Sequence, residues 1–232
     1  MVNIDIHLNK HLIFWDIDGT IMHCGSDGTK ALNLTFFQLY GIENAFTKVG
    51  IGSAMDSVIL DRIMNSFDLD PKHLGKVKEL YVKNLGEILE ANETKRVLPG
   101  IPSLLEHIHK SPHHFNALLT SNLRIGAETK LKSVGLDHYF HVGGFGDHIG
   151  EKWDAALEGI KEAEDYYQVS FSKNNIYIIG DSTYDIQCAK KLGLKSIAVS
   201  TGFVEHELLE QAEPDYLYKD LSDWQELEFI QK

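Results

Sequence analysis

The most constraining feature of the chain is a short apolar run that ends in two carboxylates. Residues 12–15 (LIFW) have the composition of a buried β-strand, and residues 16–20 (DIDGT) follow directly. Side chains two positions apart on a strand face the same side, so Asp16 and Asp18 are expected to lie close together where the strand ends. An Asp-Gly turn accounts for Asp18 but not for Asp16. Two anions this close need a cation or a shared proton, and the pattern therefore predicts a metal-dependent carboxylate site.

Strand-like apolar runs recur along the chain, and helical patterns separate most of the later ones. The predicted strands cover residues 12–15, 117–119, 142–145, 176–179, 196–199 and, more weakly, 216–218. The predicted helices between them cover residues 101–110, 125–134, 153–167 and 185–192. This alternation predicts an α/β fold, a parallel sheet with helices on both faces.

The stretch from about Met22 to Arg96 interrupts the alternation. It holds helical patterns at residues 29–40, 53–67 and 71–91 and no convincing strand. An all-helical insert directly after the first strand predicts a second, small domain. The expected division is therefore residues 22–96 for the helical domain and residues 1–21 with 97–232 for the sheet domain.

Composition limits the partners and the location of the chain. A formal net charge of −12 over 232 residues disfavours a general binder of nucleic acid or of acidic membranes, which needs a surplus of Lys and Arg. No apolar run approaches the length of a membrane span, and the N-terminus lacks a basic region followed by an apolar stretch. The two cysteines, Cys24 and Cys188, have no metal-type spacing and predict reduced thiols in a cytoplasmic protein.

Polar residues follow the predicted strands at the positions where open parallel sheets bind ligands, outside the carboxyl ends. These groups are Asp16 and Asp18, then Thr120, Ser121 and Asn122, and then residues 180–185 (GDSTYD). If the strands that precede them are neighbours, all of these groups converge on one edge of the sheet.

The residue types at that edge favour phosphoryl chemistry. Asp16, Asp18 and Asp181 would gather hard oxygen ligands of the kind that Mg²⁺ prefers, together with water and a substrate phosphate. A carboxylate beside Mg²⁺ can attack phosphorus and form an aspartyl phosphate, and a second carboxyl can protonate the leaving alkoxide and later deprotonate water. Thr120 and the turn after it can bind phosphate oxygens, and Lys152 can offset phosphate charge.

In these residues the chain resembles the haloacid dehalogenase-like superfamily of aspartyl phosphatases. The first family motif, D-x-D-G-T, matches residues 16–20, and the second, an apolar strand ending in Thr or Ser, matches residues 118–120. The fourth, G-D-x-x-x-D, matches residues 180–185. The third is a Lys or Arg at loose spacing, which Lys152 would supply. The resemblance covers nearly the whole chain.

The resemblance implies a Rossmann-like sheet with the helical insert as a C1-type cap. It implies that Asp16 is the nucleophile, Asp18 the acid/base, Asp181 a Mg²⁺ ligand, and Asp185 a group that orients the lysine or a metal-bound water. The expected site residues are Asp16, Asp18 and Lys152 for catalysis, Thr120, Ser121, Asn122 and Lys152 for substrate binding, and Asp16, Asp18, Asp181 and Asp185 for the metal.

Within the superfamily the chain looks most like the phosphoglycolate phosphatase type. Residues 97–100 (VLPG), 119–123 (LTSNL) and 143–147 (GGFGD) carry this likeness. The chain departs from many relatives of that type in the third motif, where a Pro usually follows the Lys and Trp153 follows here.

The expected function is hydrolysis of a small phosphorylated metabolite, phosphoglycolate-like or a sugar phosphate, by a monomer or homodimer. A phosphomutase or phosphotransferase that uses the same aspartyl phosphate stays open, as does a non-catalytic binding module, although all the motif aspartates are present. A dehalogenase would have no use for Asp18 as acid/base. A phosphonate hydrolase would need a cap lysine, for which Lys48 qualifies only by region.

Three further groups have two interpretations each. The Gly-rich loop of residues 50–56 is either a loop that closes over the substrate or a helix start capped by Ser53. His23 and Cys24 line either the cap entrance or a plain linker. The cluster of His107, His109, His113 and His114 is expected to form a solvated face rather than a metal site.

Overall fold

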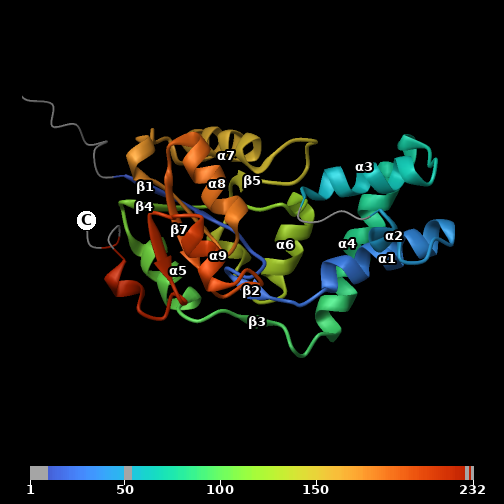
Figure 1. The fold of residues 1–232 in the computed structure, drawn as a ribbon, viewed down its shortest axis with the longest axis horizontal. Helices are drawn as coiled ribbons and strands as arrows, with labels where there is room; N and C mark the ends of the chain where they lie inside the picture. The colour runs from blue at the N-terminus through green and yellow to red at the C-terminus, as the bar shows by residue number, and fades with distance from the viewer. Residues whose placement is uncertain (1–9, 50–53, 228–229, 231–232) are drawn as a thin grey trace, which may run out of the picture.

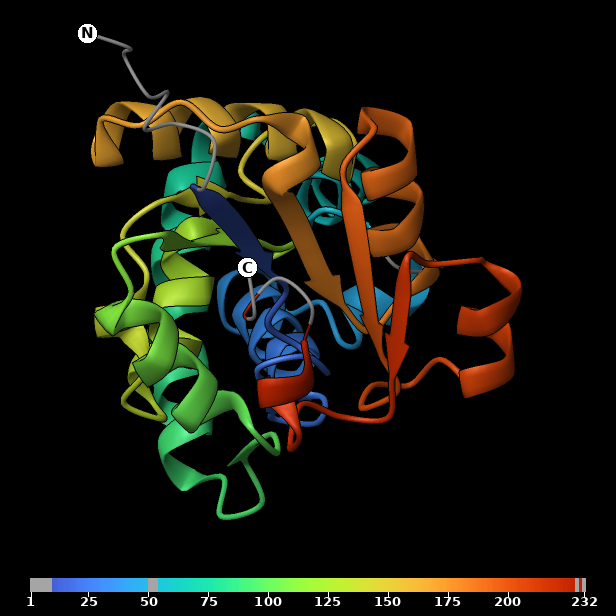
Figure 2. The same ribbon diagram turned by 90° about the vertical axis from the view of Figure 1, so that its left-hand side faces the viewer.

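A six-stranded parallel sheet forms the centre of the molecule. The computed structural model describes residues 10–49, 54–227 and 230, and it orders the strands β5-β4-β1-β6-β7-β8. The strands are β1 (His11–Trp15), β4 (His114–Leu119), β5 (Gly143–Gly144), β6 (Ile176–Gly180), β7 (Lys195–Val199) and β8 (Tyr216–Tyr218). All of their pairings are parallel, and the arrows of the strands point the same way in Figure 2. The sheet and its flanking helices confirm the predicted α/β class.

Strand β1 lies inside the sheet, and every one of its residues is buried. Its neighbours are β4 and β6, and Trp15 is level with Leu118 on one side and with Ile179 on the other. The segments that leave these three strands therefore start at the same edge of the sheet.

Helices cover both faces of the sheet, as the sequence predicted. The flanking helices are α5 (Ile101–Lys110), α6 (Arg124–Lys132), α7 (Lys152–Tyr167), α8 (Thr183–Leu192) and α9 (His206–Gln211). Short 3-10 turns lie at Pro71–His73, Asp137–Tyr139, Lys173–Asn175 and Trp224–Glu226. The alternating side chains of β1 divide between two apolar clusters: Ile13 and Trp15 join the one that includes α5 and α6, and Leu12 and Phe14 join the one against α7 and α8.

The insert after β1 is a separate helical layer at one end of the sheet (Figure 1). Its helices are α1 (Asp27–Tyr40), α2 (Ala45–Lys48), α3 (Asp56–Ser66) and α4 (Leu74–Ala91). Helices α1 and α4 pack along each other around buried Phe36, Val77 and Leu85. We call this insert the cap. Its expected limits, residues 22 and 96, stay a prediction.

The structure differs from the sequence prediction at the root of the cap. The two chain segments that join cap and sheet pair as an antiparallel ribbon of β2 (Met22–His23) and β3 (Arg96–Val97). No strand was predicted there because two residues on each side are too few to show an alternating pattern.

Other element boundaries also differ, and strand β4 begins at His114 rather than at residue 117. Helix α3 begins at Asp56, after an extended Met55, rather than at Ser53, which lies with Gly50, Ile51 and Gly52 outside the described residues. Strand β5 is shorter than expected. None of the described helices combines the length and the apolar character needed to cross a membrane.

Candidate active site

The predicted site residues lie at the shared edge of β1, β4 and β6. The backbone N–H of Asp16 donates to Ile179 O at 2.9 Å, and that of Thr120 donates to Gly144 O at 3.0 Å, so both residues are fixed by the sheet ladder itself. Asp16, Thr120 and Asp181 are all buried. A cleft of about 540 Å³ opens over these three residues and is also lined by Lys152.

Lys152 reaches the site from the first turn of α7. Its Nζ lies 2.9 Å from Asp16 Oδ1 and 2.6 Å from Asp185 Oδ1, and one tenth of its side chain is exposed. Burial lowers the pKa of this ammonium, but the two carboxylates outweigh burial and raise it above its usual value. Trp153, which departs from the family pattern, therefore does not keep the amine away from Asp16.

Asp185 is held by the start of α8. Its Oδ2 accepts from the Ser182 backbone N–H at 3.1 Å and from Ser182 Oγ at 2.5 Å, in a capping box. Its other oxygen pairs with Lys152. Both oxygens are thus engaged, an arrangement that suits a residue orienting the lysine.

Asp181 occupies a space that two glycines leave open. A Cβ on Gly202 would lie 1.5 Å from Asp181 Oδ2, and a Cβ on Gly19, whose φ is +89°, would lie 2.4 Å from it. Thr20 Oγ1 donates to Asp181 Oδ1 at 3.4 Å. Burial, followed by repulsion from Asp185, raises the pKa of Asp181 to about 7. Burial and the neighbouring carboxylate of Asp185 therefore both disfavour the ionised form of Asp181.

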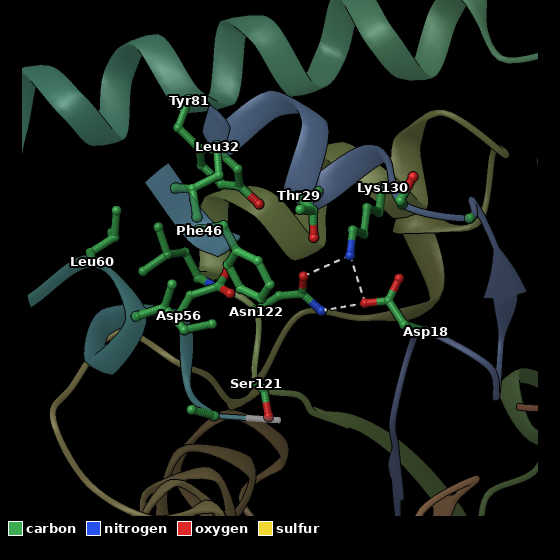
Figure 3. Close-up of a pocket in the computed structure, with 16 residues that line it drawn as sticks. Asp18, Thr29, Leu32, Phe46, Asp56, Leu60, Tyr81, Ser121, Asn122 and Lys130 are labelled. Carbon is green, nitrogen blue, oxygen red and sulfur yellow. Dashed lines mark hydrogen bonds and ion pairs between the residues drawn. The ribbon is translucent and has the colours of Figure 1, made fainter. Parts of the chain in front are cut away.

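Asp18 faces a second lysine that the sequence analysis missed (Figure 3). Asp18 Oδ2 lies 2.6 Å from Lys130 Nζ and accepts from Asn122 Nδ2 at 2.8 Å, while Lys130 donates to Asn122 Oδ1 at 2.7 Å. Burial raises the pKa of Asp18, but the charge and hydrogen bonds of Lys130, with the Asn122 hydrogen bond, bring it below its usual value. Cys24 Sγ lies 3.5 Å from Asp18 Oδ1.

Lys130 could have been found by its place on the helix. The buried residues of α6 are Gly126, Ala127, Lys130 and Leu131, a spacing that marks one helix face. A lysine at a position of the buried face is unusual unless it is paired, and that was the available signal.

The four aspartates predicted as metal ligands differ in how far lysines already neutralise them. Across residues 10–49, 54–227 and 230, no three His, Cys, Asp or Glu side chains form a ready metal cluster. Lys130 pairs with Asp18, and Lys152 pairs with both Asp185 and Asp16, so three of the four predicted ligands have a lysine partner. Burial also raises the pKa of Asp16 well above its usual value, with Lys152 opposing and the other aspartates reinforcing the shift. Asp16 and Asp181 are therefore buried carboxylates with a charge excess, and this donor pair fits a hard divalent cation.

Asn122 and Thr120 connect the two sides of the site. Thr120 Oγ1 accepts from Asn122 Nδ2 at 2.7 Å and from its backbone N–H at 3.3 Å. Asn122, Asp18, Ala54 and Ser121 line both the open cleft and a second cavity of about 460 Å³ under the cap, which we call the inner cavity.

The cap is fastened to the sheet domain at the start of α3. The backbone N–H of Asp56 donates to Ser121 O at 2.8 Å, and Asp56 Oδ2 accepts from the Leu123 N–H at 3.0 Å. The Ser57 N–H donates to Gly146 O at 2.9 Å. These hydrogen bonds hold α3 against the loops after β4 and β5, and burial raises the pKa of Asp56 to about 6.

The remaining sequence candidates lie away from this chemistry. His114 is buried at the start of β4 and stacks on His11, so the expectation of a solvated face is wrong for it. His23 Nε2 lies 2.6 Å from Thr201 O on the ribbon that joins cap and sheet. Lys48 lies over the Phe67 ring and lines neither cavity.

Known proteins of similar sequence and fold point to one family. The family description that matches is haloacid dehalogenase-like hydrolase, over residues 13–199. A phosphoglycolate phosphatase of Synechococcus elongatus is 29% identical over 161 residues, which are 69% of this chain and 71% of that protein. The pyrophosphatase PpaX of Halalkalibacterium halodurans is 26% identical over 215 residues, which are 91% of this chain and 93% of that protein.

Among solved structures, CbbY from Rhodobacter sphaeroides in complex with phosphate is similar in fold. It superimposes with a TM-score of 0.70 at 18% identity and covers 96% of this chain and 100% of its own. At that identity the likeness concerns the fold alone, and it agrees with the α/β sheet and cap.

Proposed function

The chain belongs to the family of haloacid dehalogenase-like hydrolases, and from this premise we propose that it is a phosphatase of small phosphorylated metabolites. The proposed reaction passes through a phosphoaspartate on Asp16. The relatives named phosphoglycolate phosphatase and pyrophosphatase support hydrolysis of a phosphoric ester or anhydride over transfer to a second hydroxyl. A mutase that uses the same intermediate is the second candidate, and the measurement below separates the two.

The observation that carries the proposal is the environment of Asp16. Asp16 Oδ1 lies 2.9 Å from Lys152 Nζ at the end of a buried strand, where a phosphoryl group can be attacked and its charge offset. Asp185 shares the lysine and orients it. Mg²⁺, the metal we propose for Asp16 and Asp181, supplies further positive charge against the phosphate oxygens when bound.

The proposed chemistry uses two carboxylates in sequence. An oxygen of Asp16 attacks phosphorus, the bond from phosphorus to the leaving oxygen breaks, and that oxygen takes a proton from Asp18. Asp18 must enter this step protonated, against the effect of Lys130, which lowers its pKa. Asp18 then accepts a proton from water, and the water oxygen attacks phosphorus to release phosphate and free Asp16. The Thr120 hydroxyl and the N–H groups of Ser121 and Asn122 are proposed to bind phosphate oxygens.

The hydrogen bonds that hold the cap to the sheet domain support the proposal that the substrate is a small molecule. Hydrogen bonds from Asp56 and Ser57 hold the cap to the sheet domain, and within the described residues Asp18 lines two cavities of about 460 and 540 Å³, which disfavours a folded protein as substrate. We further propose a cytoplasmic monomer or homodimer that binds neither nucleic acid nor membranes, in line with its net charge of −12. The buried, unpaired Cys24 and Cys188 agree with a reducing compartment.

The test is phosphate release from a panel of small phosphoesters, with Mg²⁺ and with a chelator. The panel contains phosphoglycolate, pyrophosphate, sugar phosphates, nucleotides and an aryl phosphate, and the Asp16→Asn variant is the control. The proposal requires metal-dependent release that the variant lacks. A wild-type protein inert on every compound, or release unchanged in Asp16→Asn, would overturn it, and isomerised sugar phosphate without release would favour the mutase.

A further inference from the structure

The inner cavity beside Asp18 holds a buried cation, Lys130, which pairs with Asp18 and to which the chemistry above assigns no contact with the substrate. Four apolar cap side chains line the cavity, Leu32, Phe46, Ile59 and Leu60. Leu32, Phe46 and Leu60 are labelled in Figure 3. Its polar wall consists mainly of Asp18, Asp56, Asn122, Thr29, Tyr81 and Lys130. Among the described residues that line it, Lys130 is the single basic side chain.

Lys130 is a buried, paired residue of the fold rather than an exposed surface side chain. Its side chain is 5% exposed, and it comes from the buried face of α6. Burying an ammonium costs several kcal/mol unless charge and hydrogen bonds offset the cost. Asp18 and Asn122 provide these partners at 2.6 and 2.7 Å, and the pKa of Lys130 is raised despite its burial.

The ammonium can still bind a ligand. It has three N–H donors, and two contacts within the described part of the chain, to Asp18 and Asn122, use two of them. A Cβ built on Gly28 of α1 would lie at ordinary contact distance, 3.8 Å, from both Lys130 Nζ and Tyr81 Oη. The ammonium and the Tyr81 hydroxyl thus border the same space inside the cavity.

We propose that Lys130 determines the substrate class of this enzyme by binding the negative group of an anionic leaving group in the inner cavity. The inference rests on the proposed phosphatase function and adds the residue that selects among esters. With the phosphoryl group at Asp16, the leaving oxygen lies by Asp18, which lines both cavities, and the rest of the leaving group extends toward Lys130. Its carboxylate or second phosphoryl group accepts from Lys130 Nζ and Tyr81 Oη.

The carboxylates in the same cavity wall compete with Lys130 in selecting the charge of the leaving group. Asp18 and Asp56 would favour a leaving group with a positive charge if they governed the cavity. Both are already engaged, Asp18 by Lys130 and Asn122 and Asp56 by the Leu123 N–H. Lys130 is likewise engaged by Asp18, so the proposal requires its spare N–H to outweigh the negative charge of Asp56, and the test includes both charges.

The experiment compares three esters whose leaving groups have two carbons and differ in charge: phosphoglycolate (anionic), ethyl phosphate (neutral) and phosphoethanolamine (cationic). In the wild-type protein with Mg²⁺, kcat/KM is expected to be highest for phosphoglycolate. In Lys130→Met, kcat/KM for phosphoglycolate is expected to fall about 100-fold further than for ethyl phosphate, because a buried charge pair with the substrate is lost. Lys130→Arg should keep part of the preference for the anion.

The control is Lys132→Met, the same change on an exposed position of the same helix, which should leave the ratio between the esters unaltered. Thermal melting shows whether Lys130→Met is folded. If it is not, inhibition of wild-type aryl phosphate hydrolysis by glycolate, compared with ethanol and ethanolamine, decides the same question.

Two results would overturn the inference while leaving the phosphatase standing. One is a wild-type enzyme that hydrolyses ethyl phosphate or phosphoethanolamine at least as well as phosphoglycolate and is not inhibited by glycolate. The other is a folded Lys130→Met that loses activity on all three esters by the same factor. If the wild type releases phosphate from none of them and from no aryl phosphate, the proposed function itself has failed.

Discussion

Two buried lysines pair with three of the four aspartates of the site. Lys152 bridges Asp16 and Asp185, and Lys130 pairs with Asp18, so the nucleophile and the acid/base each have a buried cation of their own. Asp181 is the carboxylate that receives neither lysine among the described ion pairs, and burial raises its pKa to about 7. At the residue scale, Asp181 is therefore the aspartate next to which we propose that a further cation binds.

The first prediction concerns Lys152. Replacing it with Met removes the charge next to Asp16 and leaves Asp185 without its ion pair, so kcat should fall about 100- to 1000-fold. Steady-state kinetics on an aryl phosphate measure the change. Lys161→Met, on the same helix, is the matched control; a loss of activity as large in the control would remove the special role of Lys152.

The second prediction concerns the space around Asp181. In Gly202→Ala the new Cβ would lie 1.5 Å from Asp181 Oδ2, so the carboxylate must move. We expect the Mg²⁺ concentration for half-maximal activity to rise at least about 10-fold, as for other changes that reorient a ligand. Gly75→Ala, with nothing within 4 Å of its new Cβ, is the control. An unchanged Mg²⁺ requirement would show that Asp181 is not a ligand.

At the scale of elements, the start of α3 controls how the cap meets the sheet. The Asp56 side chain accepts from Leu123, and its backbone donates to Ser121, both in the loop after β4. The ribbon of β2 and β3 is the other link between cap and sheet domain. Opening the cap about this ribbon would require the α3 contacts to break first.

The third prediction follows from the buried carboxyl of Asp56. Its pKa is raised from 3.8 to about 6, so the folded protein binds this proton more tightly than the unfolded chain does. The stabilisation is complete below pH 4 and is lost as pH rises through 6. Asp56→Asn keeps an acceptor for Leu123 and removes the charge, so at pH 7.5 it should be more stable than the wild type by up to about 3 kcal/mol.

Melting temperatures of both proteins between pH 4 and pH 7.5 check this sign. The two curves should separate as pH rises, by roughly 2–4 °C per kcal/mol for a chain of this size, and should meet near pH 4. An Asp56→Asn protein that melts below the wild type at pH 7.5 would mean that the carboxylate stabilises the cap contact.

At the scale of the whole molecule, the sequence predicted the features that depend on patterns among neighbouring residues. The β1 run, the alternation of strands and helices, and the polar groups at the strand ends all have a periodicity that can be read from neighbouring residues. Their meeting at one edge follows from the parallel order, and the structure has that order.

Long-range pairings escaped the sequence analysis. The β2–β3 ribbon joins segments more than 70 residues apart through two residues each. Strand β5 was predicted, but its short length was not: it consists of Gly143 and Gly144, which are required by close backbone contacts with Leu118 and Ala155. Lys130 contacts Asp18, 112 residues away in the sequence, only because the fold brings α6 to that edge of the sheet.

The fourth prediction concerns metal binding and stability of the whole chain. Asp16 and Asp181 repel each other in the folded state, so Mg²⁺ should raise the melting temperature of the wild type by several degrees through binding to the folded form. Differential scanning fluorimetry with Mg²⁺ and with EDTA measures this. Asp181→Asn should melt at the same temperature in both, and an equal metal effect on both proteins would contradict the assignment.

The central claim is that Asp16 carries the phosphoryl group. The most direct measurement is borohydride reduction of the protein during turnover, followed by peptide mass spectrometry, because an aspartyl phosphate is reduced to homoserine. The account predicts homoserine at position 16 only when Mg²⁺ and substrate are both present. Steady phosphate release with unmodified Asp16, or homoserine at another aspartate, would contradict it.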